Sequence, residues 1–142
     1  MRVEQEGLSL TFSGDLGRPD DPLMKTPDAL LPTDSLVVES TYGDRRHSQA
    51  NPDAELARWT SAACFREGVT VIPAFAVGRT QTLLLAIARL KARKQLPDVP
   101  VYLDSPMATD VTALYTRLGS EQRLSHEECV ALCQGVTLVL AK

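Results

Sequence analysis

The chain has 142 residues, of which 44% are hydrophobic, and a net charge of −3 at neutral pH. This length suits one soluble domain, and the negative charge excludes a wholly basic nucleic-acid binder. No apolar run is long enough for a membrane span or a signal peptide, and the three cysteines do not make a disulfide framework. The predicted compartment is therefore a reducing cytoplasm.

The first pattern is an alternation of apolar and polar residues at positions 8–12, which predicts a β-strand. Residues 1–4 are predicted to pair with it as a hairpin. The strand runs directly into Ser-Gly-Asp-Leu-Gly at 13–17, where two glycines leave room for a large ligand beside Asp15. The Asp15 carboxylate is either a hard oxygen ligand for divalent ions or a turn residue that bonds its own backbone. Spacing alone favours the turn.

From residue 35 onward, strand and helix patterns alternate, after a proline-rich loop at 18–33. The predicted strands are residues 35–39, 69–72 and 101–103, all three expected to be buried, and residues 136–140. The predicted helices are residues 51–67, 80–90, 107–118 and 125–134. Asn51-Pro52 and the Ser-x-x-Glu pattern at Ser125 are typical helix starts. The alternation predicts a parallel α/β sheet with helices on its faces.

The stretch from 68 to 97 contains no Asp or Glu. Its five basic residues are Arg79, Arg89, Lys91, Arg93 and Lys94. A local basic face can neutralise phosphates even when the whole chain is acidic. For the four residues after Arg79, a solvated helix face is an equally good interpretation.

Two of the cysteines, Cys129 and Cys133, lie one helical turn apart in the last predicted helix. Two thiols are a possible start of a metal site, but the sequence has no second pair to complete it. Both are therefore predicted to be buried core cysteines.

Four segments, in this order, resemble the β-CASP branch of the metallo-β-lactamase superfamily, which includes RNase J-like and mRNA 3′-end-processing endonucleases. They are Ser-Gly-Asp-Leu-Gly at 13–17, Val-Glu-Ser-Thr-Tyr-Gly-Asp-Arg at 38–45, Pro-Ala-Phe-Ala-Val-Gly-Arg-Thr-Gln at 73–81 and Leu-Asp-Ser-Pro-Met-Ala at 103–108. The resemblance covers nearly the whole chain and implies the middle part of such an enzyme. It implies a parallel-sheet β-CASP domain at 42–142, preceded at 1–41 by edge strands of a metallo-β-lactamase αββα domain.

The resemblance also implies catalytic roles for two acids. Asp15 matches the superfamily's metal-bridging aspartate, in a centre of two zinc ions that a His-x-His-x-Asp-His motif and further histidines also hold. Glu39 matches the acid of the first β-CASP motif, a partner to a histidine at the metal centre. The only histidines here are His47 and His126, and neither belongs to such a motif. Because a catalytic zinc ion takes about three protein ligands, we expect an incomplete metal site in this chain.

Four further residues are candidates for substrate binding. Arg45 and His47 follow Gly43 in a polar loop, where they either meet a phosphate or are merely solvated. Arg79 lies at a predicted helix start, where backbone amides favour anions and its guanidinium adds a planar fork. Ser105 precedes the next helix, as a site-edge residue or simply as its cap.

The resemblance implies a zinc-dependent hydrolase that cleaves RNA phosphodiester bonds, with single-stranded RNA as its partner. It does not fix the oligomeric state, and a homodimer is one option; no membrane partner is expected. The alternatives are a DNA-acting or general phosphodiesterase of the same superfamily and a non-catalytic scaffold that has lost metal ligands. Retention of Asp15, Glu39 and Arg79 argues against the scaffold.

Overall fold

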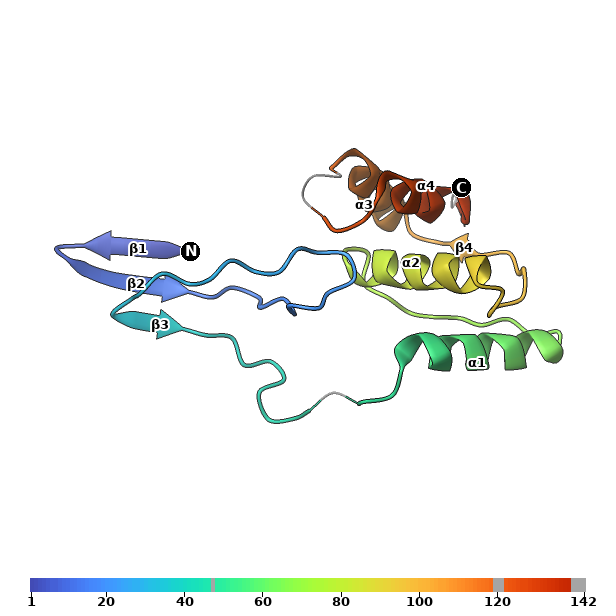
Figure 1. The fold of residues 1–142 in the computed structure, drawn as a ribbon, viewed down its shortest axis with the longest axis horizontal. Helices are drawn as coiled ribbons and strands as arrows, with labels where there is room; N and C mark the ends of the chain where they lie inside the picture. The colour runs from blue at the N-terminus through green and yellow to red at the C-terminus, as the bar shows by residue number, and fades with distance from the viewer. Residues whose placement is uncertain (47, 119–121, 139–142) are drawn as a thin grey trace. The chain divides into compact units, whose positions relative to one another are not determined.

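The computed structural model describes residues 1–46, 48–118 and 122–138, and it divides into two units, Met1–Gln49 and Ala50–Lys142 (Figure 1). Four helices and two small sheets within these described ranges confirm the mixed α/β class. The longest helices of the described ranges have 14 residues, and none of these helices is long and apolar enough to cross a membrane.

The first unit holds a three-stranded sheet in the order β1-β2-β3, formed by β1 (Arg2–Gln5), β2 (Leu8–Phe12) and β3 (Ser35–Val37). β1 and β2 are antiparallel, with Gln5 opposite Leu8. The two residues between them have positive φ angles, 51° at Glu6 and 79° at Gly7. Positive φ at both positions is the hairpin turn that matches the twist of the strands. The predicted hairpin is therefore confirmed, with the turn one residue shorter.

β3 runs parallel to β2, with Phe12 opposite Val37. Asp34, just before β3, fixes this pairing: one of its carboxylate oxygens accepts hydrogen bonds from the backbone amide of Ser9 at 2.8 Å and from its hydroxyl at 2.6 Å. The amide of Ser13 continues the ladder to the carbonyl of Val37 at 2.9 Å. Because the two strands are parallel, the loops that follow them leave the sheet at the same edge.

The prediction that residues 35–39 are buried is wrong. Leu36, Val37 and Val38 are 45%, 49% and 50% exposed. An apolar strand in a parallel arrangement is buried only when helices cover both faces of its sheet. The described part of the first unit contains no helix, so these apolar side chains have no cover there.

The second unit contains α1 (Pro52–Phe65), α2 (Arg79–Ala92), α3 (Pro106–Arg117) and α4 (His126–Gln134). The predicted starts of α1 and α4 are confirmed. The Asn51 side chain accepts hydrogen bonds from the amides of Asp53 and Ala54. Ser125 and Glu128 bond each other's amides reciprocally, at 3.1 and 3.2 Å. Such caps satisfy amides that the first turn of a helix leaves free.

The second sheet is a parallel pair, β4 (Tyr102–Leu103) and β5 (Thr137–Leu138). The predicted strand at 69–72 is wrong for this structure: it forms no ladder with any described strand, and Val69 and Val71 are 87% and 84% exposed. A strand is stabilised by its cross-strand neighbours, which an apolar run alone does not supply. Residues 139–140 of the last predicted strand lie outside the described residues.

The core of the second unit lies where α2 and α3 pack against α4, and α2 also contacts α1 (Figure 1). Leu84 and Leu85 of α2, Ala108 of α3 and Leu132 of α4 are all at most 7% exposed. Leu84, Leu85 and Leu90 of the helix predicted at 80–90 therefore lie on the face that α2 buries.

An ion pair joins α2 to α4. The guanidinium of Arg89 donates to Glu128 Oε1 from Nε at 3.1 Å and from Nη2 at 2.6 Å. Arg89 first, and the amide of Ser125 second, hold the pKa of the Glu128 carboxyl below its ordinary value. A lowered carboxyl pKa stabilises the fold at neutral pH, and this contribution disappears as the pH falls through the folded-state pKa.

We therefore expect Glu128→Gln, which keeps the helix cap, to lower the free energy of unfolding at pH 7 by roughly 0.5 kcal/mol, because the pair is partly exposed. The difference should shrink as the pH is lowered from 7 to 3, because the parent's carboxyl takes up a proton as the pH falls through its folded-state pKa. Urea unfolding followed by circular dichroism measures the difference at both pH values. Glu127→Gln on the same helix is the matched control. A difference for Glu128→Gln that is the same at both pH values would contradict the ion pair.

Candidate functional site

The loop after β2 carries Asp15 and is fastened to the segment after β3. The amide of Glu39 donates to Ser13 Oγ at 3.1 Å, and Glu39 Oε1 accepts from the amide of Leu16 at 3.0 Å. Ser13 and Leu16, on either side of Gly14 and Asp15, are thus both bonded to Glu39. The structure therefore brings the loop of one predicted catalytic acid, Asp15, against the other, Glu39.

The second carboxylate oxygen of Glu39 binds Thr41. Oε2 accepts from the Thr41 hydroxyl at 2.6 Å and from the Thr41 amide at 3.4 Å. The Thr41 hydroxyl, followed by the amide of Leu16, holds the pKa of the Glu39 carboxyl below its ordinary value. Glu39 is therefore an ionised acceptor at neutral pH, and in this chain it anchors the Asp15 loop.

Asp15 itself is exposed, and its carboxylate has no hydrogen-bond or ion-pair partner among the described residues. The preceding Gly14 has a φ of 62°, and a side chain added to it would meet nothing within 4 Å. The space beside Gly14 is open and the Asp15 side chain is exposed, so the loop offers an accessible anionic oxygen ligand at the end of a strand.

The described residues contain no group of three or more His, Cys, Asp or Glu side chains placed to hold a metal ion. Asp15 supplies one carboxylate, whereas a catalytic zinc ion takes about three protein ligands and an open position. The donor set described in this chain therefore does not fit a complete centre of two zinc ions. His47 lies outside the described residues.

The polar loop after Gly43 contains a second candidate, Arg45. Its Nε and Nη2 donate to the two carboxylate oxygens of Asp44 at 2.9 and 3.1 Å. This pair lowers the pKa of Asp44 and raises that of Arg45. Both side chains are exposed, so a phosphate that binds Arg45 competes with a neighbouring carboxylate in water.

The start of α2 differs from the predicted anion site. The amide of Arg79 donates to the carbonyl of Val77 at 3.0 Å, and the amide of Thr80 donates to that of Phe75 at 3.2 Å. The Thr80 hydroxyl bonds the same Phe75 carbonyl at 2.8 Å. The amides of Arg79 and Thr80 are thus already engaged. The Arg79 guanidinium is exposed and unpaired among the described residues, so it is a group that can meet an anion here.

Ser105 is the N-cap of α3. Its hydroxyl oxygen accepts from the amide of Ala108 at 3.2 Å, and its carbonyl accepts from the amide and the hydroxyl of Thr109, both at 3.0 Å. The capping interpretation is confirmed. Whether Ser105 also touches substrate stays a prediction.

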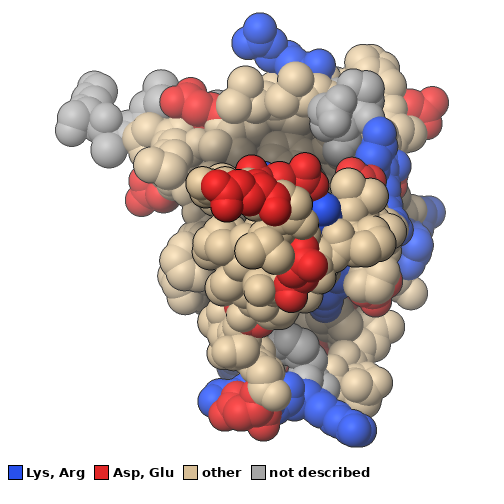
Figure 2. Space-filling model, turned by 90° about the vertical axis from the view of Figure 1, so that its left-hand side faces the viewer, with Lys and Arg blue, Asp and Glu red and all other residues tan. Residues whose placement is uncertain are grey.

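The basic residues after Arg79 divide into two kinds. Arg89 is paired with Glu128, and the Lys91 ammonium donates to Asp98 and to the carbonyl of Val99. Arg93 and Lys94 are exposed at the end of α2. Figure 2 shows both acidic and basic side chains on the face that it draws. This face is therefore not uniformly basic, and a phosphate would be attracted by individual basic residues rather than by the whole face.

Sequence reasoning missed Gln81, which is 0% exposed in the second unit. It bonds the amide of Gly78, just before Arg79, and the hydroxyl of Thr112 on α3, the helix that Ser105 caps. The sequence did contain a signal for Gln81, which is the Gly-x-x-Gln spacing at a helix start. A Gln three residues after the N-cap residue can accept a hydrogen bond from the amide of that residue.

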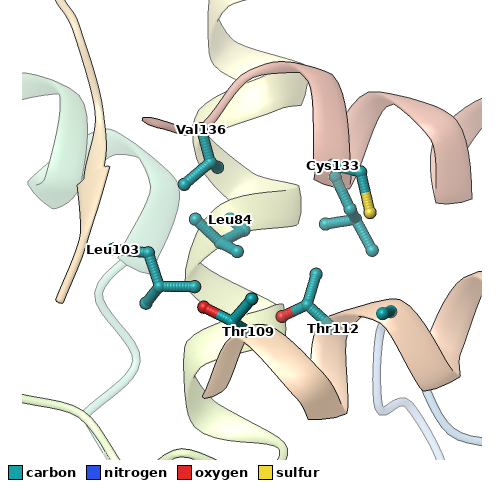
Figure 3. Close-up of a pocket in the computed structure, with 8 residues that line it drawn as sticks. Leu84, Leu103, Thr109, Thr112, Cys133 and Val136 are labelled. Carbon is teal, nitrogen blue, oxygen red and sulfur yellow. The ribbon is translucent and has the colours of Figure 1, made fainter. Parts of the chain in front are cut away.

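The second unit contains a pocket that none of the predicted site residues lines (Figure 3). It is lined by Leu84, Leu103, Thr109, Thr112, Ala113, Leu132, Cys133 and Val136. The hydroxyls of Thr109 and Thr112 bond backbone carbonyls of their own helix, so the pocket is an apolar packing gap. Cys129 is buried as predicted, whereas the prediction for Cys133 is wrong, since it is exposed.

Comparisons with known proteins point to one family. Residues 80–142 match the Beta-Casp domain. The chain is 40% identical over 119 residues to Ribonuclease TTHA0252 of Thermus thermophilus, a match that spans 82% of this chain and 27% of that protein. It is 35% identical over 119 residues to Cleavage and polyadenylation specificity factor subunit 3 of Dictyostelium discoideum, over 80% of this chain and 15% of that protein.

A third relative is the RNase J-like protein of Methanocaldococcus jannaschii, 31% identical over 123 residues, or 80% of this chain and 28% of that protein. The chain thus spans between 15% and 28% of the length of these three relatives. The matched domain and the ordered motifs agree with one another. The chain belongs to the β-CASP family of the metallo-β-lactamase superfamily.

Proposed function

We propose that the protein to which this chain belongs is a zinc-dependent hydrolase that cleaves phosphodiester bonds in single-stranded RNA. The observation that carries the proposal is the free, exposed Asp15 carboxylate on a loop that Glu39 holds by two hydrogen bonds. Its relatives' names add the substrate class, since they include a ribonuclease and an RNase J-like protein.

In this proposal Asp15 is one ligand of the metal centre, and the other ligands come from parts of the protein beyond these residues. Glu39 keeps the Asp15 loop in place and remains ionised, so it is also suited to accept a hydrogen bond from a histidine at the centre. Arg79 binds a substrate phosphate through its free guanidinium, and Arg45, His47 and Ser105 are further candidates for substrate binding.

The same proposal covers the domains. Residues 1–41 form edge strands of a metallo-β-lactamase half, and residues 42–142 belong to the β-CASP domain, which the match over 80–142 supports. The exposed apolar residues at 69–72 are then surface that other parts of a larger protein cover. Covering apolar surface of this kind is favourable, at about 25 cal/mol per Å².

The test compares RNA and DNA of one sequence. The full-length protein is incubated with 5′-labelled single-stranded oligonucleotides, without treatment, after removal of metal by a chelator, and after return of zinc. We expect cleavage of RNA, its loss with the chelator and its recovery with zinc. Cleavage of the DNA alone would replace the RNA substrate with a DNA substrate. Binding of RNA without cleavage by the zinc-loaded protein would instead favour a scaffold.

A further inference from the structure

Gln81 makes hydrogen bonds to two segments outside its own helix. Its Oε1 accepts from the amide of Gly78 at 2.7 Å, and its Nε2 donates to the carbonyl of Ala76 at 3.1 Å and to the hydroxyl of Thr112 at 3.0 Å. The carboxamide thus uses both of its donors and one acceptor site while it is fully buried. It joins the loop before α2 to α3.

The loop that Gln81 holds has an uncommon turn immediately before Arg79. Gly78 has φ 77° and ψ −63°, and the Arg79 amide bonds the Val77 carbonyl at 3.0 Å. These values define the rarer form of the γ-turn, whose positive φ glycine adopts without strain. Because glycine is so permissive, the chain stays in this one turn only where surrounding contacts hold it. Here the enforcing contacts are the bond from Gly78 to Gln81 and two bonds from Thr82 to the Gly78 carbonyl.

Building on the proposed function, we infer that Gln81 is a positioning residue that locks the γ-turn at Gly78 and so aims the Arg79 guanidinium at a substrate phosphate. Three observations meet at this point: a buried carboxamide with its donors satisfied, a γ-turn at a permissive glycine that this carboxamide bonds, and a free exposed guanidinium next to the turn. An apolar side chain would fill the same space without the cost of burying polar atoms. The carboxamide is needed because it holds the turn.

The experiment measures the affinity of the full-length protein for a short single-stranded RNA in four variants. Gln81→Met keeps the volume but releases the Gly78 amide. Thr112→Val removes the hydroxyl of α3 that Gln81 bonds and leaves the bonds of Gln81 to Gly78 and Ala76 in place. We expect Gln81→Met to weaken binding about tenfold, as Arg79→Ala does, which is the effect of losing one charge-assisted hydrogen bond. The double variant of Arg79→Ala and Gln81→Met should bind no more weakly than Arg79→Ala alone.

Thr112→Val is the matched control for mere destabilisation. It leaves Gln81 Nε2 with one partner fewer, so it should lower stability while affinity remains within about twofold of the parent, because the bond from Gly78 to Gln81 persists. An affinity loss in Thr112→Val equal to that in Gln81→Met would show a general structural effect and overturn the inference. So would additive losses in the double variant.

Other outcomes separate this inference from the proposed function. If the parent binds RNA but neither Arg79→Ala nor Gln81→Met weakens binding, the positioning role is wrong and RNA binding stands. If the parent itself binds no RNA, the proposed function fails, and the inference fails with it. Should Gln81→Met not fold, Gly78→Ala replaces it, since a side chain there has space but strains the positive φ. Parent-like affinity in Gly78→Ala would overturn the inference.

Discussion

Asp15→Asn is expected to lower the rate of RNA cleavage by the full-length protein by more than about 100-fold. The substitution keeps the size of the side chain and removes the charge that a metal-bridging ligand needs. Even outer partners of metal ligands cost about 10- to 100-fold when they are lost, so a ligand should cost more. Single-turnover cleavage of a labelled RNA measures the effect.

Two further substitutions calibrate this result. Asp28→Asn removes the charge of another exposed aspartate in the same unit, and it should leave the rate unchanged. Glu39→Gln keeps an acceptor for the Leu16 amide and loses the charge, so its cost should be smaller, about tenfold. Equal rates in Asp15→Asn and Asp28→Asn would remove Asp15 from the site.

Arg79→Ala should weaken the binding of single-stranded RNA about tenfold and lower the salt slope of binding by about 0.7, the value for one phosphate contact. The guanidinium has no acidic partner to release among the described residues, so the loss reflects the substrate contact itself. Fluorescence anisotropy at several salt concentrations, with a short and a long oligonucleotide, measures both quantities.

Arg93→Ala is the matched control, because Arg93 follows the last residue of α2 and is also exposed. The two positions are 14 residues apart, which is about 20 Å along a helix. Arg93→Ala should therefore leave the short oligonucleotide unaffected and matter only for the long one. The same loss in both variants with the short oligonucleotide would indicate a general charge effect and remove Arg79 from specific phosphate binding.

The helices were predictable because their start signals are local. Asn51 and the pair Ser125 and Glu128 bond amides within three residues in sequence, so a short segment contains the whole motif. The hairpin before Asp15 was predictable for the same reason, since its turn is only two residues long. Local hydrogen bonds of this kind depend little on the rest of the fold.

Strand burial and pairing were less predictable because they depend on distant partners. The apolar run at 69–72 is typical of a buried strand, but a ladder also requires a neighbouring strand, which the described structure does not provide. Leu36 and Val38 have the same apolar character and are half exposed, because no helix of the first unit covers them. A sequence pattern gives the tendency of a segment and not what lies against it.

Within the site, the sequence and the resemblance identified Asp15, Glu39 and Arg79, while the contacts around them came only from the structure. The bond from Leu16 to Glu39 joins residues 23 apart, and the bond from Gln81 to Thr112 joins residues 31 apart. A buried Gln cannot be distinguished from a surface Gln by residue type alone, since most glutamines are exposed. Hydrogen bonds between residues that are far apart in the chain, such as these two, cannot be predicted from local spacing.

Metal content of the full-length protein tests the central claim most directly. Protein purified in zinc-containing buffer and freed of loose metal is analysed by elemental mass spectrometry, as the parent and as Asp15→Asn, and the same samples are assayed for RNA cleavage. The account predicts about two zinc ions per parent molecule, as in two-metal hydrolases, and a loss of both bound zinc and cleavage in Asp15→Asn. Full zinc content and full cleavage in Asp15→Asn would contradict it.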